Sequence, residues 1–174
     1  MGGKARNGCQ LTWEHGCRLI CSIADHMLLN NVNTSTLPGN DLFTMVPAGS
    51  FRRGKRVLGD LDIIVLSNDV PRIKGILGKL LQKFSGGEKK FTGLLEGVQV
   101  DFVVSDKMGL GAALMHCTGP VELNVRQRAQ AKRMGLLLNE KGLWRGDERL
   151  ACSSSEREIY ETLGLRWLEP EGRG

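Results

Sequence analysis

Hydrophobic positions along the chain first follow a helical period and then fall into short apolar runs. Apolar residues at helical spacing, preceded by Thr12 as a capping residue, predict a helix over residues 13–29. A short apolar run at 43–48 and the β-branched run DLDIIVL at 60–66 each predict a strand. The residues between them, 49–59, are rich in Gly and Arg, which indicates a turn.

The remainder of the chain continues this alternation and then becomes mainly helical. Pro71 begins an apolar pattern that predicts a helix to about Phe84, ended by two glycines. The other expected elements are strands at 90–95 and 98–104, helices at 107–115, 120–134 and 156–163, and a hairpin at 135–144. This order predicts an α+β fold, a small mixed sheet with flanking helices followed by a helix and hairpin subdomain.

Composition describes a basic globular protein. The chain has 174 residues, of which 41% are hydrophobic, with 24 Lys and Arg against 19 Asp and Glu. This is too apolar for a disordered chain and long enough for one domain or two small lobes. No apolar stretch approaches the ~20 residues of a membrane span, and no secretory signal is recognised. We therefore expect a cytoplasmic protein that has no contact with membranes and acts as a monomer.

Cysteine usage adds little chemistry. The cysteines are Cys9, Cys17, Cys21, Cys117 and Cys152. Their odd number and irregular spacing favour reduced thiols. The first three lie near His15 and His26, so a zinc site is the alternative, but the spacing matches no standard zinc motif.

Basic residues gather in two segments. Residues 42–59 and 123–139 each hold four Lys or Arg and no acid. The two segments are suited to line a groove for a polyanion, although charge alone equally fits two solvated surfaces. Helical spacing places Arg128 and Lys132 on one face of the second segment.

The chemistry is concentrated between residues 49 and 62. Asp60 and Asp62 project to one face of their predicted strand, where two carboxylates favour a bound cation such as Mg²⁺. If the strand that carries Asp101 is adjacent, three carboxylates meet, as two-metal phosphoryl transfer requires. A Gly49-Ser50 turn offers N–H groups and a hydroxyl to phosphate oxygens. The alternative, exposed acids beside an ordinary turn, does not account for this combination.

These residues resemble a known family. The segment GSFRRGK…GDLD is similar to the nucleotidyltransferase signature, and specifically to that of family X DNA polymerases, which are DNA polymerase beta-like. The segments HCTGP, LLNEKGL and SEREIY resemble the family's later segments, so the resemblance runs from about Thr12 to the C-terminus. It implies a minimal form like the compact viral members, with a palm over 1–110 and a nucleotide-selecting, DNA-contacting subdomain over 111–174. We expect no N-terminal lyase domain and no lyase activity.

The resemblance also implies residue roles. Asp60, Asp62 and Asp101 would be catalytic and bind two Mg²⁺ ions, with Mn²⁺ as an alternative. The implied nucleotide-binding residues are Gly49, Ser50, Arg53, Gly59, His116, Cys117, Gly119 and Asn124. Arg128 and Lys132 would bind DNA. Gln99 stands where many members have Arg. Cys117 replaces an aromatic residue that screens the sugar, which predicts looser exclusion of ribonucleotides.

The expected function is template-directed DNA synthesis. The chain would add deoxynucleotides from dNTPs to a primer 3′-OH, filling short gaps in DNA repair, and its partners would be gapped or primer–template DNA; a ligase partner is not indicated by the sequence. One alternative is nucleotidyl transfer to a small molecule, a protein or tRNA. The other is a non-catalytic module that binds DNA gaps.

Overall fold

The structure, a computed structural model, describes residues 11–30 and 44–173. The first part contains β1 (Leu11–Thr12), α1 (Trp13–Leu29), β2 (Thr44–Pro47), α2 (Gly49–Arg52), β3 (Val57–Leu58), β4 (Leu61–Leu66), α3 (Val70–Leu80), β5 (Gln82–Gly86), β6 (Lys90–Leu95) and β7 (Val98–Ser105). The second part contains a 3₁₀ turn (Lys107–Gly109), α4 (Leu110–Thr118), α5 (Val121–Arg133), β8 (Leu137–Asn139), β9 (Gly142–Arg145), β10 (Glu148–Arg149), a 3₁₀ turn (Ala151–Ser154), α6 (Glu156–Thr162) and a last 3₁₀ turn (Pro170–Gly172).

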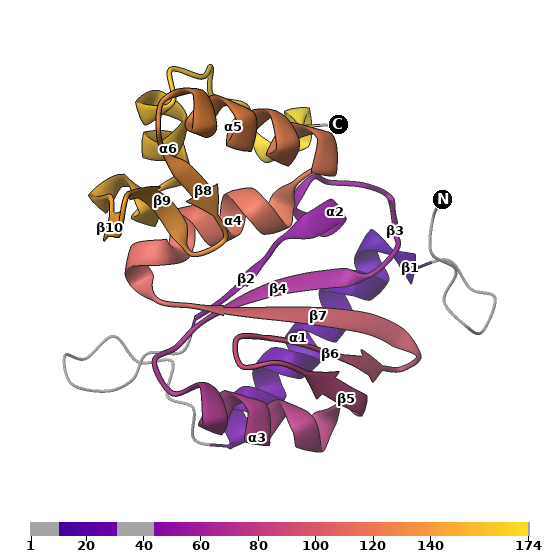
Figure 1. The fold of residues 1–174 in the computed structure, drawn as a ribbon. Coiled ribbons are helices and arrows are strands. Elements are labelled where there is room, and N and C mark those ends of the chain that lie inside the picture. Colours follow the sequence, from indigo (N-terminus) through magenta and orange to yellow (C-terminus); the bar gives the residue numbers. More distant parts are fainter. Residues whose placement is uncertain (1–10, 31–43, 174) are drawn as a thin grey trace.

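A five-stranded mixed sheet forms the centre of the molecule (Figure 1). Its strand order is β2-β4-β7-β6-β5, with β4 and β7 parallel and the other neighbouring pairs antiparallel. The parallel register places Asp62 directly opposite Asp101 and Ile64 opposite Val103. The two carboxylates thus lie side by side, Asp62 near the start of β4 and Asp101 in the middle of β7.

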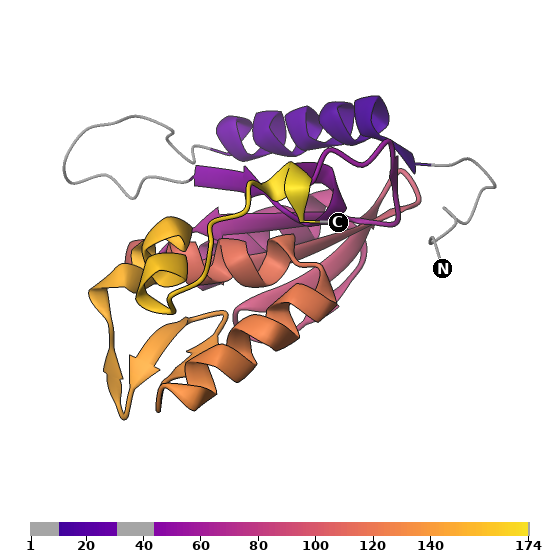
Figure 2. The ribbon, with the colours of Figure 1, turned by 90° about the horizontal axis from the view of Figure 1, so that it is seen from above.

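Alternation along β4 divides its side chains between two hydrophobic layers. Ile63 and Val65 pack with Leu19 of α1 and Leu77 of α3 in the main core. Ile64 points the other way and packs with α4 residues. Figure 2 shows α1 on one side of the sheet and α4 and α5 on the other. We call the side that bears Asp62, Ile64 and α4 the carboxylate face.

Helix α4 joins the sheet to the C-terminal part. Ala113 packs with Ile64 of the sheet, whereas Ala112 and Met115 belong to a second core formed with α5, α6 and the β8–β9 hairpin. A Cβ on Gly111 would lie 2.4 Å from the Ser155 backbone, so only glycine allows this approach. Small residues thus allow α4 to pack closely against both the sheet and the C-terminal core.

The predicted fold class is confirmed, with local differences. Helix α1 has the expected bounds and its Thr12 cap, whose side chain accepts from the His15 N–H. The helix predicted to reach Phe84 is wrong at its end: α3 stops at Leu80, and β5 pairs with the edge of β6. Residues 49–52 form a short helix where a turn was expected. Cys9, one of the residues of the alternative zinc site, lies outside the described residues. The four cysteines within the described residues are free thiols.

Among the described helices, none has the length and apolar character needed to cross a membrane.

Candidate active site

Three aspartates from two neighbouring strands lie together at one end of the carboxylate face. Asp60 directly precedes β4, Asp62 is its second residue, and Asp101 faces Asp62 from β7. The expectation that these strands are adjacent is confirmed. The Asp101 carboxylate accepts hydrogen bonds from Gln99 Nε2, at 3.2 Å to Oδ1 and 2.9 Å to Oδ2. Gln99 therefore orients the carboxylate of Asp101.

Burial and mutual repulsion disturb the ionisation of this group. Burial, with the charges of Asp60 and Asp101, raises the pKa of Asp62 to about 7, while Arg53 acts in the opposite direction. The pKa of Asp60 is also raised, first by burial and then by Asp101, again opposed by Arg53. Repulsion of this kind is relieved by a proton or by a bound cation.

The short helix α2 packs its first residue against Asp62. Gly49 has a φ of 57°, and a Cβ there would lie 1.9 Å from Asp62 Oδ2, so the position requires glycine. The Ala48 N–H donates to the Asp62 carbonyl at 2.8 Å and fixes the approach. Ser50 Oγ and Arg53 Nε are buried and have no partner among the described residues. A bound anion such as phosphate would satisfy such donors.

Arg53 connects this turn to the end of α4. Its Nη1 donates to the Thr118 carbonyl. A Cβ built on Gly119, whose φ is 61°, would lie 3.7 Å from Arg53 Nη1 and 4.0 Å from Asn124 Nδ2. Residues predicted from two distant segments to bind the nucleotide are therefore neighbours.

His116 organises the beginning of α5. Asn124 Nδ2 donates to the His116 carbonyl at 2.7 Å, and Arg128 Nη2 donates to His116 Nδ1 at 2.8 Å. Burial, followed by the charges of Lys90 and Arg128, lowers the pKa of His116, so its imidazole is neutral near pH 7. Because guanidinium has no acceptor, Nδ1 must carry the lone pair. Neutral His116 thus positions Arg128.

The other predicted residues lie around this centre. Burial, with the charge of Asp62, raises the pKa of Cys117 to about 12, so its thiol is uncharged beside the carboxylates. Gly59 is exposed immediately before Asp60. Lys132 is exposed on α5, one helical turn beyond Arg128.

Sequence reasoning missed a buried ion network that joins the turn to the chain's end. Arg52 donates to Thr118 Oγ1 at 2.7 Å and to Glu156 Oε2 at 2.6 Å. Glu156 also accepts from Arg173 Nη1 at 2.7 Å, and the Arg173 side chain is 0% exposed. The guanidinium of Arg173 lies 5.1 Å from the ring centroid of Trp167. Since Arg52 and Glu156 are far apart in the chain, spacing gave no signal for this contact.

The donor set suits a hard divalent cation. Carboxylate oxygens are the preferred ligands of Mg²⁺, and the raised pKa values of Asp60 and Asp62 mark a place where positive charge is favourable. Within residues 11–30 and 44–173, no three His, Cys, Asp or Glu side chains already stand in a ligand arrangement. The aspartates would therefore have to draw closer around an ion.

A mixed sheet with three aspartates beside a Gly-Ser turn, followed by a helical C-terminal part, defines a nucleotidyltransferase core. Comparison with known families agrees: residues 26–141 match the DNA polymerase beta palm and residues 113–174 the DNA polymerase beta thumb. The chain belongs to the DNA polymerase beta family, family X.

Relatives and solved structures are consistent with this family. The chain is 30% identical to DNA polymerase lambda of Arabidopsis thaliana over 84% of its own length but only 34% of that protein. It is 27% identical to the Repair DNA polymerase X of an African swine fever virus isolate, over 74% of this chain and 80% of the viral one. The chain thus spans about a third of the plant relative. Leishmania infantum polymerase beta, in a ternary primer–template complex, has the same fold, with a TM-score of 0.74, 20% identity, and coverage of 95% of this chain and 77% of that one.

Proposed function

We propose that this chain is a template-directed DNA polymerase that transfers a nucleotide from a dNTP to a primer 3′-OH. The observation that carries the proposal is the placement of Asp62 opposite Asp101, with Asp60 adjacent and the Gly49 turn in contact with Asp62. The names of its relatives, DNA polymerase lambda and Repair DNA polymerase X, support DNA synthesis and a role in repair, and we propose the filling of short gaps as the form that this repair takes.

The aspartates and the α2 turn would divide the chemistry. Asp60 and Asp62 would hold two Mg²⁺ or Mn²⁺ ions and Asp101 would complete one site; when bound, the ions activate the hydroxyl and neutralise phosphate charge. Asp101, oriented by Gln99, would take up the proton of the 3′-OH.

The remaining predicted residues would hold the substrates. The triphosphate would be bound by Gly49, Ser50, Arg53 and Gly59. Ser50 Oγ and Arg53 Nε are buried and have no hydrogen-bond partner in the described part of the chain. His116, Cys117, Gly119 and Asn124 would bound the sugar and base, and Arg128 and Lys132 would contact DNA. On this proposal residues 1–110 act as the catalytic palm and 111–174 as the subdomain that selects the nucleotide.

Primer extension tests the proposal directly. The wild-type chain is given each dNTP on gapped, primer–template and single-stranded DNA, beside the double variant Asp60→Asn/Asp62→Asn. The matched control is Asp147→Asn, an exposed acid in the β9–β10 turn. We expect incorporation that matches the template, full activity in the control, and a loss of at least about 10³-fold in the double variant.

Two outcomes would overturn the proposal. Incorporation that ignores the template would remove the template-directed assignment. Transfer to a small molecule, protein or tRNA without extension of DNA would favour the alternative acceptor class instead.

A further inference from the structure

The side chain of Gln99 lies at the side of Asp101 where a cation would bind. Its Nε2 donates to both carboxylate oxygens, at 3.2 Å to Oδ1 and 2.9 Å to Oδ2. The two residues are two positions apart on β7 and therefore share one face of the strand. A donor that reaches both oxygens lies in front of the carboxylate. A divalent cation or a guanidinium group takes the same position when it contacts both oxygens.

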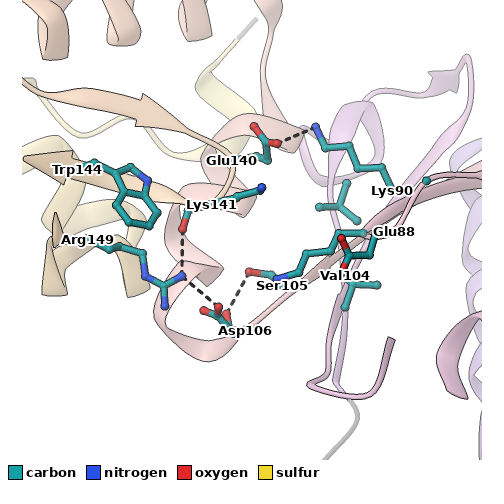
Figure 3. Close-up of a pocket in the computed structure, with 12 residues that line it drawn as sticks. Glu88, Lys90, Val104, Ser105, Asp106, Glu140, Lys141, Trp144 and Arg149 are labelled. Carbon is teal, nitrogen blue, oxygen red and sulfur yellow. Dashed lines mark hydrogen bonds and ion pairs between the residues drawn. The ribbon is translucent and has the colours of Figure 1, made fainter. Parts of the chain in front are cut away.

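The partner of Asp101 is neutral, whereas other acids at the sheet are paired with cations. Arg149 Nη1 lies 3.0 Å from Asp106 Oδ2, and Lys90 Nζ lies 3.3 Å from Glu140 Oε1. Both ion pairs border the cavity between the sheet and the C-terminal hairpin (Figure 3). In each pair the charge of the acid is balanced by the protein. The amide at Asp101 donates a hydrogen bond but carries no charge, so the negative charge of this carboxylate is not balanced by its partner.

Asp60 and Asp62 differ from Asp101 in having no such donor. Within the described part of the chain, neither carboxylate accepts a hydrogen bond, and burial together with the neighbouring acids raises both pKa values. The register of β4 and β7 places Asp62 directly opposite Asp101. A cation between these two carboxylates would therefore meet one that has no hydrogen-bond donor and one that the amide already contacts.

We propose that Gln99 is a positioning residue that competes with a divalent cation for Asp101. The amide contacts both oxygens of Asp101 in the free protein and gives up the oxygen that a cation takes. Because a hydrogen bond is lost in this exchange, Gln99 lowers the affinity of the ion site that Asp101 completes. The inference rests on the proposed function for the existence of this ion site, and it makes Gln99 the residue that sets the ion concentration at which the site fills.

The test measures Mn²⁺ binding to the free protein, without DNA or nucleotide, from the electron paramagnetic resonance signal of unbound Mn²⁺. Gln99→Met keeps the length of the side chain and removes the donor, so it should tighten binding by about two- to ten-fold, the range for one net hydrogen bond. Gln99→Arg places a permanent cation at the same carboxylate and should weaken binding instead. Effects of opposite sign distinguish competition from a merely structural role.

Two controls locate the effect at Asp101. Gln82 is an exposed glutamine of β5, two strands away from β7 in the same sheet. Gln82→Met and Gln82→Arg should therefore leave the Mn²⁺ affinity unchanged. In an Asp101→Asn background the carboxylate is absent, so Gln99→Met should no longer tighten binding.

The outcomes for the inference and for the proposed function are separate. The inference is overturned if Gln99→Met binds Mn²⁺ no more tightly than the wild type, or if it tightens binding equally in the Asp101→Asn background. Absence of Mn²⁺ binding in every variant would overturn it as well. Primer extension on gapped DNA is measured in parallel: Mn²⁺ affinities that change as expected, without any extension of DNA, would overturn the proposed function and support the role of Gln99.

Discussion

At the scale of single residues, Asp62 has the clearest energetic signature in the site. Its pKa of about 7, against an ordinary 3.8, means that the folded protein keeps a proton that the unfolded chain releases near pH 4. Between these values the native state binds more protons, so the free energy of unfolding falls as the pH rises from about 4 to 7. Above pH 7, ionised Asp62 therefore lowers the free energy of unfolding unless a cation is bound.

Asp62→Asn should therefore raise the thermal unfolding midpoint by several degrees at pH 8 in EDTA, and by much less at pH 4.5. The measurement is differential scanning calorimetry of both proteins at both pH values. Adding Mg²⁺ at pH 8 should raise the midpoint of the wild type but not that of the variant. Asp147→Asn serves as the control, and an equal gain at both pH values in Asp62→Asn would contradict the argument.

Cys117 is a second single residue with a testable effect, because the size of its side chain, and not its charge, should affect the selection of the sugar. Its thiol is uncharged, half-buried and close enough to Asp62 to feel its charge. If the sugar of the nucleotide lies here, Cys117→Tyr should raise the preference for dNTPs over rNTPs by about ten-fold, since a bulky ring excludes the 2′-hydroxyl. Single-nucleotide incorporation kinetics measure the ratio. Cys117→Ser, which preserves the volume, should leave it unchanged, and strict exclusion of rNTPs by the wild type would refute the idea.

At the scale of elements, α2 depends on the glycine at its start. Gly49→Ala adds a Cβ that would overlap the Asp62 carboxylate. It also forces an alanine to adopt the positive φ of this position, which costs about 1–2 kcal/mol for the backbone alone. We expect a lower unfolding free energy in urea together with loss of primer extension. Gly75→Ala in α3 is the matched control, because a Cβ there meets nothing within 4 Å and the exchange should stabilise by about 0.5–1 kcal/mol. Equal behaviour of the two variants would contradict this account.

The contact of α2 with α6 makes a separate prediction. Glu156 is 6% exposed and accepts from both Arg52 and Arg173, so Glu156→Ala leaves two guanidinium groups without their carboxylate. Removing one member of a buried ion network costs about 3–5 kcal/mol, which urea unfolding would detect. Glu161→Ala, an exposed acid in the same helix, should change stability by no more than about 0.5 kcal/mol. An equally small change for Glu156→Ala would mean that the ion network does not stabilise the contact between α2 and α6.

The sequence predicts an element well where the spacing of its apolar residues fits only a helix or only a strand, and poorly where the spacing fits both. Helix α1 has a cap and a long period, and its bounds agree with the prediction. After Leu80 the apolar spacing of Leu81 and Phe84 fits a helix and a strand alike, and pairing with β6 decides for the strand. The proximity of Gly49 and the aspartates was predictable, because these residues lie close in sequence or on strands with a clear apolar pattern. The Arg52–Glu156 contact was not, since a pairing across two subdomains has no local pattern.

At the scale of the whole molecule, charge governs how the protein would hold DNA. The basic residues of α5 are exposed, and α5 lies on the opposite side of the sheet from α1 (Figure 2). Binding through phosphates releases counterions, so the logarithm of the affinity should fall linearly and steeply with the logarithm of the salt concentration.

Removing single positive charges should show which face of the protein causes the salt dependence of DNA binding. Arg128→Ala and Lys132→Ala should each lower the salt slope by about one, whereas Arg18→Ala on α1 should leave it unchanged. Anisotropy titrations on gapped DNA at several salt concentrations measure the slopes. Affinity that is indifferent to salt, or equal effects of all three variants, would exclude a DNA surface on α5.

Helix α4 sets a limit on how such enzymes can be recombined. Because it supplies Ala113 to the core under the sheet and Met115 to the core of the C-terminal part, it cannot be assigned to either one alone. A chimera with a crossover at residue 110 would pair one parent's α4 with a sheet that did not evolve against it. A crossover after Gly119 would keep α4 with its own sheet but would require its other side to accept a foreign hairpin and α6. Exchange of thumbs between relatives therefore calls for repacking one face of α4, and Gly111 must be retained wherever α6 follows.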